Sequence, residues 1–263
     1  MSTAVPLWLV RKDLGLSLER GLPRVLARAV TLQQMLIFCG YYRRMGIAEL
    51  FLSGRPEGLF ENLSKSARAF LFYLEGAEET AKATSKSEPF FDAVACGDVH
   101  AAHAIAEHSR STWNADVEYE EDFLYMRFLM ERFALGAWEN SLDGLLQRYE
   151  QVLDGGDDPR LSLCRALHGK GQQLFDETLD RIVGDRRRKT EKQLQEGQVS
   201  PNDAATVSHL WVELLALLRF AEQATLKLDG NQPFAPSVAR KLELARLPPA
   251  EAWRDIPSFH YLA

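Results

Sequence analysis

The segment 113–122, with the sequence WNADVEYEED, holds the densest group of chemically capable side chains in the chain. Paired carboxylates perform acid/base catalysis when burial separates their pKa values. Carboxylates and aromatic rings that are exposed together instead suit the recognition of a basic protein. The segment combines five carboxylates with two aromatic residues: Trp113, Asp116, Glu118, Tyr119, Glu120, Glu121 and Asp122.

Other arrangements typical of enzymes are missing from the sequence. There is no GxSxG nucleophile elbow, no GxxxxGK[ST] phosphate loop and no GxGxxG motif after a strand. Carboxylates crowded at the start of a helix are explained more simply by their favourable interaction with the helix dipole and by solvation. We therefore predict no catalytic residues, no cofactor and a non-enzymatic function.

A metal site is also not predicted. His100, His103 and Glu107 share one face of an expected helix, at steps of three and four residues. That face lies opposite the apolar one and should point to solvent, without the partner element that a metal site needs. No histidine has a glutamate three residues before it, as a di-metal carboxylate bundle requires. The loop 154–160 lacks the ligand pattern of a calcium-binding hand and is expected to be an ordinary helix-breaking loop.

The charge distribution favours a basic protein partner. A net charge of -6 disfavours nucleic acid, whose phosphates require a basic surface. Between Glu107 and Asp158 there are 13 acidic and four basic side chains, a balance of -9 that leaves about +3 for the rest of the chain. Such a negative field would attract a basic partner and accelerate its encounter.

Composition and targeting signals indicate a cytoplasmic protein that does not enter membranes. No apolar run reaches the roughly 18 to 20 residues that cross a bilayer, and the N-terminus has no basic region followed by an apolar stretch. The cysteines are odd in number and widely spaced, at Cys39, Cys96 and Cys164, which suits a reducing compartment.

Nearly every periodic segment repeats with the 3.6-residue period of a helix, and convincing strands are missing. We predict an all-α fold, a multi-helix array or bundle of about eight to ten helices without significant sheet. An N-terminal helical segment, 1–85, is expected to pack with the main region, 86–263, and the polar tract 85–89 marks the boundary. The expected elements include a helix with Pro23 in its first turn, a helix over 58–85, a helix capped by Asp98, a helix through about Phe133, one over 141–153, a continuous apolar seam over 161–182 and an internal helix over 207–221.

Three stretches resemble the immunity protein 49 family of bacterial polymorphic toxin systems. They are the helix start containing Ala95, Gly97, Asp98 and Ala101, the 113–125 stretch with its EYEEDFLY core, and the late helix WVELLALLRFAE. The resemblance runs from about residue 90 to the C-terminus. It implies a predominantly helical protein, encoded beside a toxin, that neutralises the toxin by binding. No catalytic residues carry over, and the hallmark positions are Trp113, Glu118, Tyr119, Asp122 and Tyr125.

The combined prediction is an immunity protein that occludes a cognate toxin, with a basic, nuclease-type toxin favoured by the charge. The seven residues of segment 113–122 named above are the predicted partner-binding site. A helical adaptor for another cellular protein is the alternative, and a helical enzyme or metal-binding bundle is a third reading. Nothing in the sequence sets the oligomeric state.

Overall fold

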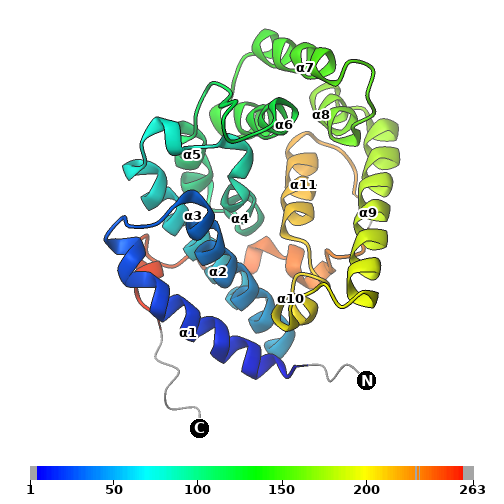
Figure 1. Cartoon of the computed structure of the whole chain (residues 1–263). Helices are drawn as coiled ribbons and strands as arrows, with labels where there is room; N and C mark the ends of the chain where they lie inside the picture. Colours follow the sequence, from blue (N-terminus) through cyan, green and yellow to red (C-terminus); the bar gives the residue numbers. More distant parts are fainter. Residues whose placement is uncertain (1–4, 229, 231, 257–263) are drawn as a thin grey trace.

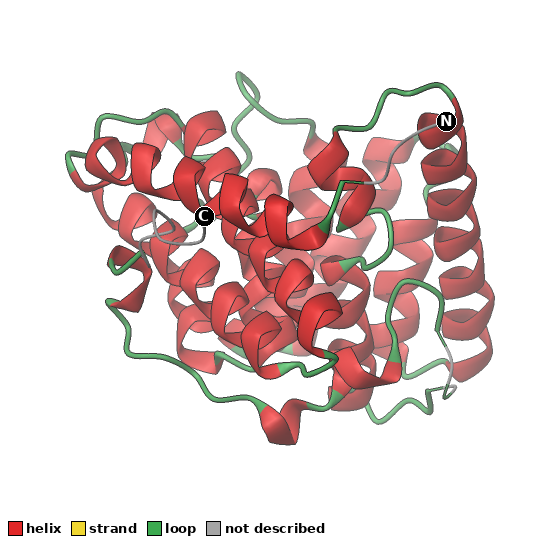
Figure 2. Ribbon diagram, turned by 90° about the horizontal axis from the view of Figure 1, so that it is seen from below, coloured by secondary structure: helices red, strands yellow, loops and turns green. Residues whose placement is uncertain are grey.

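The computed structural model describes residues 5–228, 230 and 232–256 (Figure 1). In this part of the chain there are eleven α-helices, ten of them with seven or more residues, and no strand. The ribbon drawn by secondary structure shows only helices joined by loops (Figure 2). The all-α prediction is confirmed. The helices are α1 Leu7–Leu26, α2 Leu32–Ser53, α3 Glu57–Gly76, α4 Glu88–Cys96, α5 Val99–His108, α6 Glu120–Met130, α7 Glu139–Leu153, α8 Pro159–Gly169, α9 Gln172–Gln195, α10 Pro201–Ala205 and α11 Val212–Gln223.

Helices α1, α2 and α3 pack in sequence along one side of the molecule, and α3 also packs against α4 and α5 (Figure 1). The expectation that Pro23 begins a helix is wrong, because Pro23 lies near the end of α1. The start of α2 is set instead by a capping box. Thr31 Oγ1 accepts a hydrogen bond from the Gln34 backbone N–H (3.3 Å), and Gln34 Oε1 accepts one from the Thr31 N–H (3.1 Å).

The apolar seam over 161–182 belongs to two helices and not to one. Helix α8 ends at Gly169, and Lys170 adopts a left-handed backbone with φ of 54°. Gly171 then precedes the first turn of α9. The chain reverses there, so that α8 and α9 pack side by side at the edge of the molecule (Figure 1). The apolar residues keep their helical spacing from α8 into α9, so the periodic pattern does not reveal the reversal between them.

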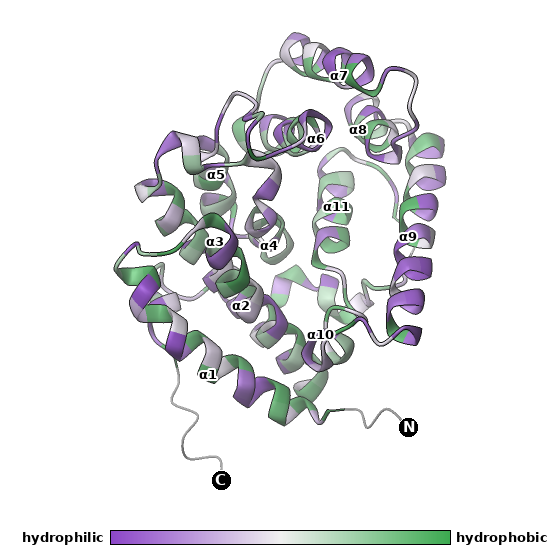
Figure 3. Cartoon of the chain, viewed as in Figure 1, coloured by the Kyte–Doolittle hydropathy of each residue, from purple (hydrophilic) through white to green (hydrophobic). Residues whose placement is uncertain are grey.

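Helices α4, α6 and α11 supply the centre of the core. Phe220 of α11 stacks on Phe90 of α4, with ring centroids 6.0 Å apart, and on Phe133, with centroids 4.4 Å apart. Phe133 lies in a π-helical turn, Glu131–Leu135, that extends α6. Much of α9, at the edge of the molecule, is hydrophilic (Figure 3), and the side chains that it buries include Phe175, Leu179 and Val183. In the part of the chain that is described, no helix is long and apolar enough to span a membrane.

The start of α5 explains why one of the recognised motifs contains Gly-Asp. Gly97 ends α4 with a left-handed φ of 75°, which favours glycine. Asp98 is 1% exposed and caps α5 by accepting the Ala101 N–H (3.0 Å). Its two carboxylate oxygens also accept hydrogen bonds from Arg68 of α3, at 2.8 and 2.7 Å. The predicted cap is therefore confirmed, and it also links α3 to α5.

The segment after α11 crosses the N-terminal helices and is anchored by Trp253. This side chain is 2% exposed, and its ring lies 5.2 Å from that of Phe72 in α3. The Trp253 carbonyl accepts a hydrogen bond from the Tyr42 hydroxyl in α2. Both ends of the described chain therefore contribute to the same core. Of the six histidines in the sequence, His260 lies outside the described residues.

Candidate functional site

Glu118 folds the segment 113–122 onto its neighbours. Its side chain is 8% exposed. One carboxylate oxygen accepts the backbone N–H of Ser85 (2.7 Å), and the other accepts that of Asn114 (3.2 Å). The side-chain amide of Asn114 in turn donates to the carbonyls of Thr80 (3.2 Å) and Lys82 (3.0 Å). The segment is thus tied to the connection between α3 and α4 by side chains that face inward.

The side chains of the same segment that face outward are aromatic, apolar and acidic. Tyr119 is 73% exposed, Val117 is 47% exposed and Trp113 is 40% exposed. The Trp113 indole N–H donates to the carbonyl of Glu118 (2.9 Å), which fixes the orientation of the ring. Asp116 is exposed and makes no hydrogen bond or ion pair with other described residues. Such large apolar side chains lose favourable burial when they remain in water.

The remaining carboxylates of the segment begin α6, and two of them bind arginines. Glu120 pairs with Arg148 of α7 in a two-pronged contact, at 2.7 and 2.9 Å. Asp122 accepts a hydrogen bond from Arg160 of α8 (2.6 Å). Glu121 is half-buried. The predicted site is therefore divided between an exposed loop (Trp113, Asp116, Val117 and Tyr119, hereafter the outer loop) and side chains that hold the fold together.

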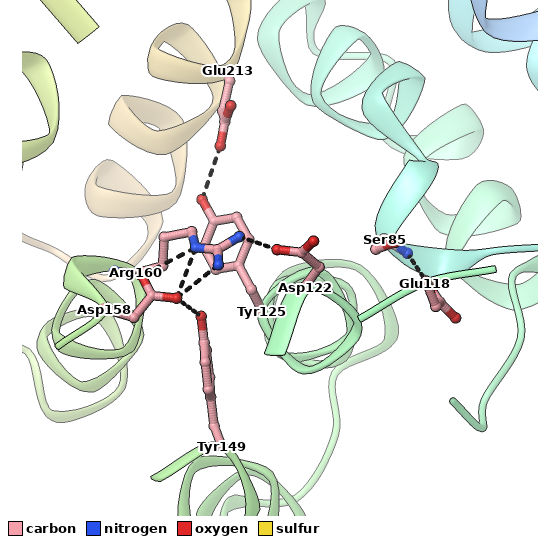
Figure 4. A network of polar contacts seen from close by, with 8 residues as sticks. All are labelled: Ser85, Glu118, Asp122, Tyr125, Tyr149, Asp158, Arg160 and Glu213. Atoms are coloured by element: carbon pink, nitrogen blue, oxygen red, sulfur yellow. Dashed lines mark hydrogen bonds and ion pairs between the residues drawn. The ribbon is translucent and has the colours of Figure 1, made fainter. Parts of the chain in front are cut away.

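Arg160 is the centre of a polar network between α6, α7 and α8 (Figure 4). Its guanidinium contacts Asp158 (2.7 Å) and Asp122 (2.6 Å), and it lies over the ring of Tyr125, 5.3 Å from the centroid. Asp158 also accepts a hydrogen bond from the Tyr149 hydroxyl (2.7 Å). Every charged group in this network faces an opposite charge or a donor, as partly buried charges require.

Tyr125 extends the network to α11, where its hydroxyl donates to Glu213 (3.1 Å; Figure 4). Burial raises the pKa of Tyr125 well above its ordinary value, and the charge of Glu213 raises it further. Burial likewise raises the pKa of Glu213. Burial also acts to raise the pKa of Asp158, but hydrogen bonds from Arg160 and Tyr149 outweigh it and hold that pKa below its ordinary value.

The negative charge of the 107–158 region is partly neutralised in the folded protein. Arginines just beyond the region reach back to it: Arg160 binds Asp122 and Asp158, and Arg181 binds Asp157 (2.6 Å). Arg165 binds Glu150 (2.8 Å) in the same way. The acidic side chains of the region that make no ion pair or hydrogen bond with other described residues are Asp116, Glu121, Glu139 and Asp154. Fewer acidic side chains of this region are therefore left without a partner than the sequence suggests.

The histidines considered as metal ligands lie on an exposed helix face. His103 Nδ1 is 3.2 Å from a Glu107 carboxylate oxygen, and about half of each side chain is exposed. Among the described residues, no three histidine, cysteine or acidic side chains are grouped as metal ligands would be. The pair on α5 therefore has the geometry of a surface contact.

The Arg160 network and the Tyr125–Glu213 contact were not predicted from the sequence. In the sequence Arg160 falls in the segment 154–160, which was expected to be an ordinary helix-breaking loop, whereas in the structure it lies in the first turn of α8. A signal was present, since Asp158-Pro159 is a typical helix start and Asp158 caps α8 by accepting the Arg160 N–H (2.9 Å). Besides Asp158, Arg160 contacts Tyr125 and Asp122, which lie 35 or more residues away and which no local pattern reveals.

The fold and these contacts define an all-helical protein whose buried charges hold helices together and whose outer loop presents aromatic and acidic groups. Comparison with family models matches residues 38–239 to immunity protein 49. The chain belongs to the immunity protein 49 family. The match begins well before residue 90 and so includes most of α2 and all of α3, which the resemblance in sequence had left out. Searches of curated proteins and of solved structures found no match to this chain.

Proposed function

We propose that this immunity protein neutralises a cognate bacterial toxin by binding it and covering its active site or substrate-binding surface. Membership of the family supports this proposal. The outer loop is the surface that fits the role best, because exposed aromatic side chains are typical anchors of protein interfaces. The observation that carries the assignment is the exposure of Tyr119, 73%, on a loop whose backbone is held by buried Glu118.

A fixed loop favours tight binding. Ordering a flexible loop during association costs free energy, which a loop already held in place avoids. Trp113 is oriented by its bond to the Glu118 carbonyl, and Asn114 bonds to the preceding connection. The outer loop therefore presents its side chains in a defined arrangement before any partner arrives.

The partner is proposed to be basic, as a nuclease-type toxin that binds a polyanion would be. Support comes from the acidic groups near the outer loop that have no arginine or lysine partner, Asp116 and Glu121. Charges of this kind mainly accelerate encounter, and their effect weakens as salt screens them. We place this encounter in the cytoplasm, and the toxin in a polymorphic toxin system encoded beside the immunity gene.

Co-expression with the product of the adjacent toxin-like gene tests the proposal. Host survival and co-purification at low and high salt are the readouts. Rescue with a stable complex is the expected result. If an active toxin kills the host and no complex forms, the proposal is wrong and the protein is better explained as an adaptor for another partner.

Single variants then locate the interface. Tyr119→Ala and Asp116→Asn test the outer loop, and Trp8→Ala is the matched control, because Trp8 is an exposed aromatic (58%) on α1. The control should retain rescue. An association rate that does not change with salt would contradict the electrostatic part of the proposal and leave the occlusion part standing.

A further inference from the structure

A cavity of about 650 Å³ lies between α2, α4 and α11, and residues from α9 and the 200–211 segment also line it. Its volume is within the range of small-molecule sites. The wall is partly apolar, with Ile37, Phe91 and Trp211 among its side chains. Ile37 is 45% exposed, which is unusual for a large aliphatic side chain. The cavity is separate from the outer loop and has no part in the proposed docking.

Two arginines in the cavity wall already pair with carboxylates. Arg43 binds both carboxylate oxygens of Asp92, at 2.6 and 2.9 Å, and Asp92 is fully buried. Arg44 binds Asp203 of α10. These four charges stabilise the junction of the helices, and they leave few donors or acceptors to spare for a ligand.

Four further charges in the wall lack such partners, and they comprise two carboxylates and two cations. A buried oxygen of Glu88, Oε2, makes no hydrogen bond with any described residue, and Glu213 receives one from Tyr125. The Arg186 Nε is buried and lacks an acceptor, although a terminal nitrogen of the same guanidinium donates to the Val207 carbonyl (3.5 Å). The guanidinium lies 5.4 Å from the Trp211 ring centroid. Lys86 is exposed at the same cavity and forms no ion pair with described residues.

Buried groups without hydrogen-bond partners are costly, so the wall is incomplete without a molecule that supplies both missing kinds of partner. A cation alone would satisfy the two glutamates but would be repelled by Arg186 and Lys86. An anion alone would satisfy Arg186 and Lys86 but would be repelled by the two glutamates. A molecule with an ammonium and a carboxylate group satisfies both sets and adds no net charge to a region that already balances.

We propose that this cavity binds a small zwitterion with an apolar side group, the chemical class of the free α-amino acids. Its ammonium group would donate to Glu88 and Glu213, and its carboxylate would accept from Arg186 and Lys86. The apolar group would lie against Ile37, Phe91 and Trp211. Burial lowers the pKa of Arg186 and raises that of Glu213, which agrees with charges that are incompletely compensated within the protein.

Calorimetric titration of the full chain with three matched probes tests the proposal. The probes are L-phenylalanine, 2-phenylethylamine, which lacks the carboxylate, and 3-phenylpropanoate, which lacks the ammonium group. L-leucine and L-methionine test other apolar groups. We expect at least one amino acid to bind, and each truncated probe to bind about tenfold more weakly, as the loss of a charge-assisted hydrogen bond predicts.

Variants connect binding to the cavity. Glu88→Gln and Arg186→Gln should each weaken binding about tenfold or more. Glu191→Gln and Arg187→Gln are the matched controls, because both residues are exposed on α9 and neither lines the cavity. Thermal unfolding of all four variants checks that each of them is folded. No binding of any amino acid at about 10 mM, or equal binding of the truncated probes, would overturn the proposal. An equal loss of binding in the two control variants would also overturn it.

Discussion

The carboxylate of Glu118 accepts a hydrogen bond from the backbone N–H of Ser85, 2.7 Å away, across 33 residues of sequence. The same carboxylate accepts the N–H of Asn114. It thus serves as acceptor for backbone N–H groups in two segments that lack regular backbone hydrogen bonding. Buried backbone donors are nearly always satisfied, and a carboxylate satisfies two of them with charge-assisted bonds. One side chain therefore fixes both the connection before α4 and the loop before α6.

Replacing Glu118 with glutamine should destabilise the protein by about 1–3 kcal/mol, because the amide group can accept only one of the two N–H bonds. Urea unfolding followed by circular dichroism measures this change. The control is Glu121→Gln, three residues further on, which should shift stability by less than about 0.5 kcal/mol. Equal stability of the Glu118 and Glu121 variants would show that the two hydrogen bonds have no net effect.

Tyr119→Ala should leave the free energy of unfolding within about 0.5 kcal/mol of the parent, since its side chain is 73% exposed. Its effect should appear in toxin binding, as a loss of about tenfold or more, because exposed aromatics that become buried in an interface dominate affinity. Surface plasmon resonance with the purified toxin measures the dissociation constant. Unchanged affinity in this variant and in Trp113→Phe, which alters the second aromatic of the loop, would place the interface elsewhere.

Local signals in the sequence were sufficient to predict the fold class and several helix boundaries. Asp98 was expected to cap α5, and its side chain does so. These signals act within four residues, where the sequence determines the geometry directly. The reversal at Lys170 was not predictable in this way, because lysine seldom adopts a left-handed backbone and carries no turn signature.

The roles of the acidic residues were only partly predictable. The cluster at 116–122 was evident, but the sequence could not say which carboxylates face solvent. Glu118 and Asp122 are used in long-range contacts, with Ser85 and Arg160, that depend on how the helices pack. Nothing near Glu213 in the sequence indicates that it contacts Tyr125 and borders a cavity.

Arg160→Met should destabilise the protein by about 3–5 kcal/mol, because it leaves Asp158 and Asp122 without the cation that compensates their burial. Side-chain exposure in this contact is low to moderate, 33% for Arg160 and 12% for Asp158, so the lower end of that range is expected. Urea unfolding at neutral pH is the measurement. The control is Arg165→Gln, whose exposed pair with Glu150 should contribute no more than about 1 kcal/mol. Similar losses in both variants would contradict a central role for Arg160.

Glu213→Gln should stabilise the protein at neutral pH. Burial raises the pKa of Glu213 in the folded state above its ordinary value of 4.5, so folding favours the protonated form. Stability from this group is therefore fully present below the unfolded pKa and is lost as the pH rises through the folded pKa. Glutamine resembles the protonated side chain and still accepts the Tyr125 hydroxyl, so the variant avoids that loss.

The pH dependence separates this explanation from a simple gain in packing. The difference in melting temperature between Glu213→Gln and the parent should be largest near neutral pH and should vanish below about pH 4, where both side chains are uncharged. Asp158 acts in the opposite direction, since its lowered pKa gives stability above its unfolded pKa that is lost on acidification. This contribution of Asp158 to stability is the same in the variant and in the parent, so it cancels in the difference between their melting temperatures. A stabilisation that persists unchanged at low pH would mean that the charge of Glu213 does not destabilise the folded protein.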